Sequence, residues 1–236
     1  MSTINTDKIA TRNLIFYLDA ANRNSYLSGT TWTDLTQNRR NGTLTNGPTF
    51  SSQNAGYFTF DGVNDYTDFG NTSLDIAAGA TGLTLEAWVY PVTFASYGGI
   101  ISRVGGVSPF GGWMLNVNSD GSVNKFDLAI NISGNWRTWV TGGGTFGGSL
   151  STSRWYHVVS TYNGSTLEMY LNGTKYNSIS YSGTIQYASV NNLYVGLNGG
   201  GAYFNGRISN VKVYNRDLTQ SEVTSNFNAH RARYGI

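Results

Sequence analysis

Residues 155–179 read WYHVVSTYNGSTLEMYLNGTKYNSI, and this stretch decides the fold class. Its two Asn-Gly pairs, Asn163-Gly164 and Asn172-Gly173, are typical of tight hairpin turns, because both central residues of such a turn need positive φ angles. Between the turns the side chains alternate, with Leu167 and Met169 on one face of a half-buried strand. The stretch therefore predicts a three-stranded antiparallel meander.

The same pattern of short strands and turns extends along the chain. We predict strands at about 14–19, 57–60, 66–69, 83–89, 99–103, 113–117, 125–132, 192–197 and 207–214. Pairs of Asn-Gly or Asp-Gly, each read as a turn, begin at Asn41, Asn46, Asp61, Asp120, Asn163, Asn172, Asn198 and Asn205. An all-β sandwich or jelly roll is the architecture that such a pattern favours.

One helix is predicted near the C-terminus. Thr219-Gln-Ser-Glu222 is a capping box, in which the first and fourth residues satisfy each other's backbone N–H groups. The helix should run from about Gln220 to Asn228. We find no linker-like tract, so we expect residues 1–236 to form a single domain with loose ends at about 1–12 and 231–236.

Composition excludes several classes of protein. The chain carries 15 Lys and Arg against 13 Asp and Glu, a net charge of +2, so no strong field is available for nucleic acid. No apolar run approaches the ~20 residues that cross a bilayer, so we expect no membrane insertion. Residues 1–8 lack the pattern of a secretory signal. Without cysteine, the chain has neither disulfides nor thiolate metal ligands.

The acidic residues argue against an enzyme. A glycoside hydrolase needs two carboxylates on either side of the scissile bond. Among the acids within predicted strands, Glu86, Asp127 and Glu168 lie on three different strands. His157 and His230 have no nucleophile motif beside them, and we expect His157 to be structural. We therefore predict a protein without catalytic residues.

Several motifs, taken in order, resemble a known family. The segments are Leu14–Ala20, Trp32–Leu35, Asn41–Pro48, Phe60–Tyr66, Leu83–Pro91, Trp155–Val159, Tyr170–Gly173, Phe204–Tyr214 and Asp217–Glu222. Together they resemble laminin-G-like jelly-roll domains of the concanavalin A-like lectin/glucanase superfamily, over about residues 13–228. The resemblance implies an all-β sandwich of two antiparallel sheets with one short C-terminal helix.

The N-terminal motifs are similar to versions of this domain in structural proteins of tailed bacteriophages. This resemblance implies a non-enzymatic decoration or fibre protein on the virion surface, which contacts other virion proteins, forms a homo-oligomer or adheres to a host-surface glycan. The alternative is a carbohydrate-binding module of a bacterial surface or secreted protein. A polysaccharide hydrolase is disfavoured, because hydrolases of this superfamily carry a Glu-x-Asp-x-x-Glu or Glu-x-Asp-x-Glu strand that this sequence lacks.

The resemblance also implies one structural Ca²⁺ ion. The positions that match the family's ligands are Asp19, Asp61, Gly62 and Asn210, and calcium accepts carboxylate, amide and carbonyl oxygens. Asn210 stands where hydrolase relatives have Asp, which lowers the charge of the site. The alternative is that Asp19 and Asp61 cap turns through bonds to the backbone.

Aromatic and amide side chains suggest where a glycan would bind, because sugars stack on aromatic rings and pair with polar groups. The candidate segment is 131–148, with Asn135, Trp136, Arg137 and Trp139, and we expect Tyr97 and Tyr203 from other loops to converge on it. The alternatives for these aromatic residues are packing and, for the two tryptophans, contact with another protein.

Overall fold

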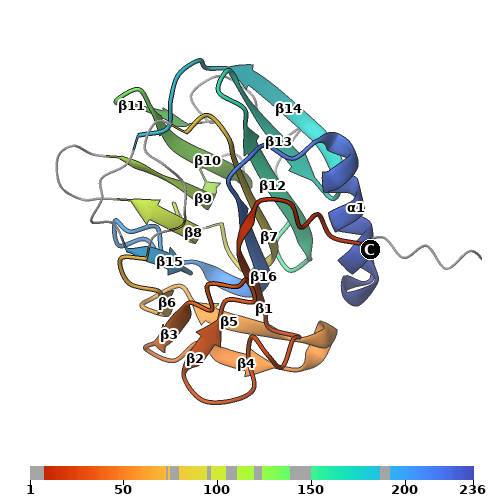
Figure 1. The fold of residues 1–236 in the computed structure, drawn as a ribbon. Coiled ribbons are helices and arrows are strands. Elements are labelled where there is room, and N and C mark those ends of the chain that lie inside the picture. The colour runs from red at the N-terminus through yellow and green to blue at the C-terminus, as the bar shows by residue number, and fades with distance from the viewer. Residues whose placement is uncertain are drawn as a thin grey trace, which may run out of the picture.

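The protein is a sandwich of two antiparallel sheets (Figure 1). The computed structural model describes residues 8–72, 74, 80–94, 97–104, 111–119, 124–138, 150–186 and 192–236. Sheet A contains, in spatial order, β14 (Thr174–Ser180), β13 (Thr166–Leu171), β12 (Tyr156–Tyr162), β7 (Leu83–Pro91), β16 (Asn205–Tyr214), β5 (Tyr57–Asp61) and β4 (Thr49–Ser51); β1 (Leu14–Asp19) also pairs with β16. The predicted meander is confirmed as β12, β13 and β14.

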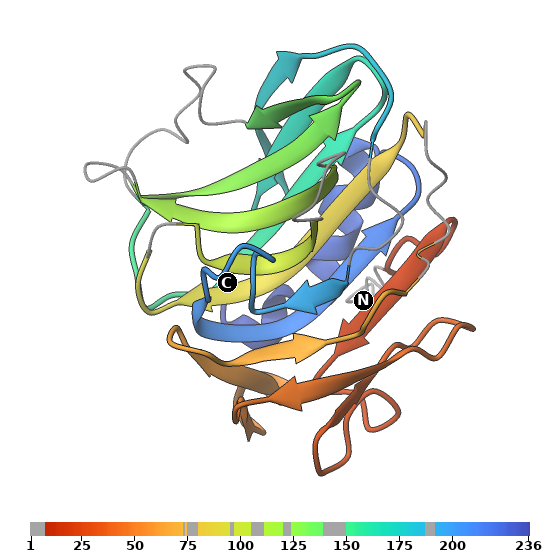
Figure 2. The same cartoon turned by 90° about the vertical axis from the view of Figure 1, so that its left-hand side faces the viewer.

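Sheet B lies against sheet A and faces the viewer in Figure 2. Its spatial order is β11 (Asn135–Thr138), β10 (Asn124–Ile132), β9 (Gly112–Ser119), β8 (Gly99–Val104), β15 (Leu193–Val195), β6 (Tyr66–Asp68), β3 (Asn41–Thr45) and β2 (Thr31–Thr33). All pairings between these strands are antiparallel. The predicted fold class is confirmed.

One large apolar core fills the space between the sheets. Successive side chains of a strand point to opposite faces, so alternate residues of each strand enter this core. Sheet A contributes Phe58, Phe60, Leu85, Val211 and Val213, and sheet B contributes Trp32, Trp113, Leu115, Phe126, Leu128 and Val195. The remaining side chains lie on the two outer faces, where a site must be sought.

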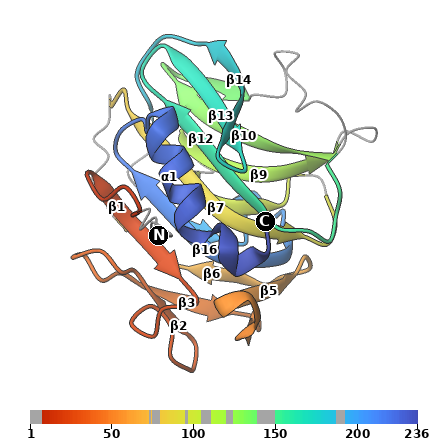
Figure 3. The same ribbon diagram turned by 90° about the vertical axis from the view of Figure 1, so that its right-hand side faces the viewer.

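Helix α1 (Gln220–Arg231) covers the outer face of sheet A and is followed by a 3-10 turn at Ala232–Tyr234 (Figure 3). The predicted capping box is present, with Thr219 N donating to Glu222 Oε2 at 3.0 Å and Glu222 N donating to Thr219 Oγ1 at 3.3 Å. The helix extends beyond the predicted end at Asn228. Within the described ranges, no helix is long and apolar enough to cross a membrane.

Two of the predicted turns are wrong. Asn41-Gly42 lies within β3, and Asn205-Gly206 begins β16. A Cβ atom at Gly42 would lie 2.4 Å from the Phe69 ring, and one at Gly206 would lie 2.3 Å from the Tyr90 carbonyl oxygen. These glycines are therefore required by close packing within strands rather than by the turn geometry that the dipeptides suggested.

Parts of both predicted loose ends pack against the rest of the chain. Ala10 N donates to Asn226 Oδ1 at 2.7 Å, which ties the N-terminal segment to α1. At the other end, Tyr234 is 6% exposed and its ring lies 4.1 Å from that of Trp88. The two ends pack on the outer face of sheet A because each covers apolar surface there. Residues 1–7 lie outside the described residues.

Candidate functional site

The predicted glycan-binding residues Asn135, Trp136 and Arg137 lie on β11, at one edge of sheet B. Trp136 pairs with Asn131 and shares the outer face, whereas Arg137 pairs with the core residue Ile130. The Arg137 guanidinium lies 5.0 Å from the Tyr181 ring, so it packs at the edge of the sandwich. The predicted Trp139 lies outside the described residues.

The other two predicted residues do come together, but not with β11. Tyr203 forms an isolated bridge with Gly99, two residues after the half-exposed Tyr97. Gly99 begins β8, and Tyr203 also bridges to Leu197, just after β15. Because β10, β9 and β8 separate β11 from β15, the two groups are about 19 Å apart at the usual strand spacing. Tyr97 and Tyr203 therefore do not converge on Asn135, Trp136 and Arg137 of β11, whereas residues 139–148 of the predicted segment lie outside the described residues.

A cluster of three tyrosines lies on the outer face of sheet B instead. The ring of Tyr66 lies 5.7 Å from that of Tyr194 and 6.2 Å from that of Tyr203. The buried residues Thr67 and Val195 pair with each other and point inward, so their neighbours Tyr66 and Tyr194 point outward. All three rings are half-buried, which leaves part of each one open to a ligand.

Polar groups surround this tyrosine cluster. Asp68 pairs with Tyr194 across the strands, and Asn192 Nδ2 donates to Asp68 Oδ1 at 3.5 Å. Burial and the nearby Asp68 carboxylate raise the pKa of Tyr194, so its hydroxyl stays protonated and can donate. Asn198 accepts hydrogen bonds from Gly200 N and Ala202 N, at 2.8 and 3.0 Å, and so shapes the loop that carries Tyr203.

A buried amide lies in the same part of sheet B. Asn116 pairs with Gly99 on one side and Asp127 on the other, one strand away from the bridge to Tyr203. It is 0% exposed, and neither atom of its amide has a hydrogen-bond partner among the described residues. A buried amide without hydrogen bonds lowers the stability of the fold unless water or a ligand reaches it.

Sequence reasoning identified Tyr203 but missed Tyr66, Tyr194 and Asn116. The alternation within 66–69 and 193–195 marks the outward positions, which is a usable signal. The pairing of β6 with β15, which brings these positions together, has no local signal.

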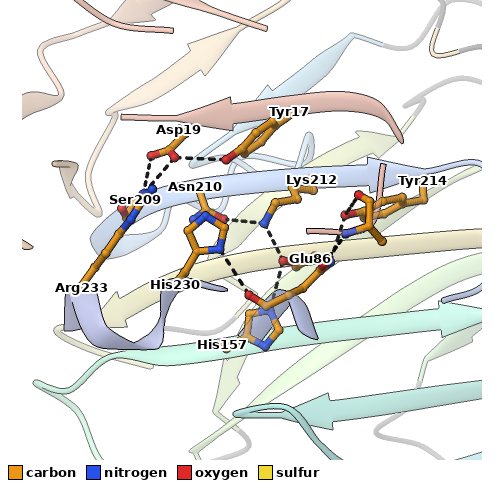
Figure 4. Close-up of polar contacts among 12 residues, drawn as sticks. Tyr17, Asp19, Glu86, His157, Ser209, Asn210, Lys212, Tyr214, His230 and Arg233 are labelled. Carbon is orange, nitrogen blue, oxygen red and sulfur yellow. Dashed lines mark hydrogen bonds and ion pairs between the residues drawn. The ribbon is translucent and has the colours of Figure 1, made fainter. Parts of the chain in front are cut away.

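The four predicted calcium ligands do not lie together in one group. The carboxylate of Asp19 accepts from Arg233 Nη1 at 2.9 and 3.1 Å, from Tyr17 OH at 3.1 Å and from Ala21 N at 3.0 Å (Figure 4). Asn210 Oδ1 faces Lys212 Nζ at 3.4 Å. Cationic side chains of the protein therefore occupy the oxygens that calcium would need.

Asp61 and Gly62 lie elsewhere. Asp61 pairs with Asn205, whereas Asp19 pairs with Asn210, five residues further along β16. The Asp61 carboxylate accepts from the N–H groups of residues 63, 64 and 65, and these bonds lower its pKa. The turn-capping alternative describes this residue, as it does Asp19 through Ala21 N. The described residues contain no group of three or more His, Asp or Glu side chains placed to hold a metal ion.

A buried ionic cluster joins sheet A to α1 (Figure 4). Glu86 on β7 contacts Lys212 Nζ at 2.6 Å and His157 Nε2 at 3.1 Å through Oε1, and Asn226 Nδ2 at 2.6 Å through Oε2. All four side chains are 0% exposed. Burial by itself would raise the pKa of Glu86, but Lys212 and His157 outweigh it and hold the pKa well below its usual range. This carboxylate is therefore a structural anion.

The comparison with protein families identifies the fold. A model described as the concanavalin A-like lectin/glucanases superfamily matches residues 61–224, more than half of the chain. The chain belongs to this superfamily. A search of curated proteins found no match to this concanavalin A-like domain.

Solved structures share its architecture at low identity. Domain 4 of AbnA, an extracellular arabinanase from Geobacillus stearothermophilus in complex with arabinotriose, has a TM-score of 0.68 at 15% identity, and the match covers 90% of this chain and 97% of that one. The binding domain of Paraclostridial Mosquitocidal Protein 1 has a TM-score of 0.64 at 18% identity, with 92% and 52% covered. A Trypanosoma rangeli sialidase in complex with sialic acid has a TM-score of 0.62 at 16% identity, with 95% and 34% covered.

This concanavalin A-like domain thus spans about half of the toxin binding domain and a third of the sialidase. At these identities the likenesses show a shared fold and nothing further about activity.

Removing the charge of Glu86 should destabilise the domain strongly. Glu86→Gln leaves the ammonium of Lys212 buried without its counter-ion, and we expect the free energy of unfolding to fall by about 3–5 kcal/mol. Urea denaturation measures this. The control is Glu168→Gln, which removes the surface pair with Lys175 and should cost less than about 1 kcal/mol. Equal effects of the two variants would contradict the structural role of the buried cluster.

Acid should weaken the domain through its two buried histidines. Burial, with Lys212 and Arg233 nearby, lowers the pKa of His230 to about 3, and burial lowers that of His157. Histidines of the unfolded chain take up protons near pH 6.5. The contribution of the two neutral, buried histidines to the free energy of unfolding is therefore fully present above that pH and is lost as the pH falls below it. Below about pH 5.5, where an unfolded histidine is almost fully protonated, His230 should contribute a slope approaching about 1.4 kcal/mol per pH unit, and His157 should add to the loss in the same direction.

Denaturation at several pH values, compared with His230→Gln, tests this expectation. In the variant, the free energy of unfolding should change less steeply with pH, by the amount that one histidine contributes. An identical pH profile for the variant and the wild type would contradict it.

Proposed function

We propose that this chain is a non-catalytic carbohydrate-binding domain that holds its glycan on the outer face of sheet B. The observation that carries the proposal is the tyrosine cluster of Tyr66, Tyr194 and Tyr203, whose rings come from β6, from β15 and from the loop after β15. Aromatic faces stack on the C–H surfaces of sugars, and the neighbouring Asp68 and Asn192 supply partners for hydroxyl groups.

The outer face of sheet A is less suited to the role. α1 and the C-terminal turn cover its centre, and the polar side chains beneath them contact one another. The superfamily includes lectins by its description, and domain 4 of the arabinanase was solved with arabinotriose. Both facts support a glycan as the class of ligand.

The placement of the acids supports binding without hydrolysis. Glu86 is held in the buried cluster, and Glu168 on β13 pairs with Lys175 and Tyr170. Asp127 lies in sheet B, on the other side of the core from both. Asp127 therefore cannot face either glutamate across one glycosidic bond, as hydrolysis requires, and Glu86 is fully buried and so cannot reach a substrate.

Glycan-array screening followed by calorimetry on the best glycan tests the proposal. We expect Tyr194→Ala and Tyr66→Ala each to weaken binding about tenfold, because each removes a stacking ring. Tyr176→Ala is the matched control, since this tyrosine is 37% exposed but lies on β14 of sheet A. Melting temperatures confirm that each variant is folded.

Two results would refute the site. One is the absence of any glycan that binds the wild-type domain. The other is unchanged affinity in the Tyr66→Ala/Tyr194→Ala double variant. If Trp136→Ala then loses binding, the glycan site lies on the edge strand β11 instead.

We also propose that the domain is carried on a phage particle, where glycan binding would serve adhesion. The resemblance of the N-terminal motifs to versions of this domain in structural proteins of tailed phages motivates this setting. Mass spectrometry of purified virions should detect the protein in stoichiometric amounts. Its presence in a cell-wall or culture-medium fraction, with none in virions, would instead support a carbohydrate-binding module of a bacterial surface or secreted protein.

A further inference from the structure

One arginine on the outer face of sheet A is held between two aromatic rings. The Arg207 guanidinium lies 4.4 Å from the ring of Tyr90 and 4.9 Å from that of Tyr57. Arg207 on β16 is the direct strand partner of Tyr90 on β7 and of Thr59 on β5. The strands that carry these residues, β7, β16 and β5, are neighbours in sheet A, whose outer face α1 covers in part (Figure 3).

The two tyrosine rings are themselves fixed. Trp155 contacts both of them, with its ring 5.7 Å from Tyr57 and 5.6 Å from Tyr90. Tyr57 and Trp155 are 4% and 5% exposed, and Trp155 packs in turn on Tyr234 at 4.7 Å. The half-buried guanidinium therefore rests on a rigid aromatic base, so little side-chain entropy is left to lose when a ligand binds.

Arg207 has no acidic partner among the described residues, unlike three other arginines. Arg40, Arg216 and Arg233 pair with Asp34, Glu222 and Asp19 respectively. Arg207, by contrast, makes neither an ion pair nor a hydrogen bond with any part of the chain that the structure describes. Stacking on the rings uses the face of the guanidinium and leaves its N–H groups, which radiate in the plane, free to donate.

We propose that Arg207, with the neighbouring hydroxyls of Thr59 and Tyr90, forms an oxyanion-binding site on the outer face of sheet A. A planar guanidinium fits a carboxylate or sulfate through two parallel hydrogen bonds, so the site takes the carboxylate or sulfate group of an acidic sugar. The site is separate from the tyrosine cluster on sheet B and does not depend on it. The two proposed sites lie on opposite faces of the domain and share no residue.

Titration with sodium glucuronate, followed by Trp fluorescence and by NMR shifts, tests the site. Glucose is the neutral control, and sodium sulfate is the second probe. We expect saturable binding of an oxyanion but not of glucose, with affinity reduced about tenfold or more in Arg207→Gln. Arg23→Gln removes the same charge from an exposed loop position and should bind like the wild type.

The remaining comparisons separate this site from the proposed glycan site. Tyr66→Ala/Tyr194→Ala should keep its affinity for the oxyanion, and Arg207→Gln should keep its affinity for a neutral glycan. If Arg207→Gln does not fold, Arg207→Lys takes its place, because it keeps the charge and loses the planar fork; it should also bind more weakly. If only glucuronate binds, the site recognises a carboxylate; if only sulfate binds, it recognises a sulfate group. Failure of both probes to bind, or unchanged affinity in the folded Arg207 variant, overturns the proposal.

Discussion

Strand β16 has to bury both of its faces, and the rest of the structure depends on this constraint. One face carries Val211 and Val213 into the core between the sheets, and the other carries Lys212 and Tyr214 under α1. Its edges are also fully used, because β7 lies along one side while β1 and β5 share the other. A buried lysine in such a strand needs a fixed anion, which Glu86 on the adjacent strand β7 supplies.

This constraint makes the two outer faces chemically different. On sheet A, the helix brings Asn226 to the second oxygen of Glu86, and the C-terminal turn brings Arg233 to Asp19. These contacts hold chain segments together, whereas Arg207 lies beyond this cover. On sheet B, half-buried tyrosines and polar side chains stay available at the surface. The asymmetry explains why we assign glycan binding to sheet B.

Local signals predicted most of the elements. The strands around the Asn163 and Asn172 turns and the Thr219 capping box are interactions between near neighbours, so the pattern of nearby residues suffices. Prediction failed at Gly42, because the ring of Phe69 that demands a glycine there is distant in the sequence. The contact between Arg233 and Asp19 likewise had no local signal, since these residues lie 214 positions apart. Trp136 and Tyr203 were grouped by residue type, but three intervening strands separate them.

By itself, the sequence determined where strands and turns occur and which side chains share one face of a strand, because alternation and turn preference are properties of adjacent residues. It also determined, through its ordered motifs, the superfamily to which the chain belongs. Only the tertiary structure decided which faces meet. The order of strands in a sheet places Tyr194 beside Tyr66 and Arg207 beside Tyr90, and this order follows from burial summed over the whole core, which no local pattern records.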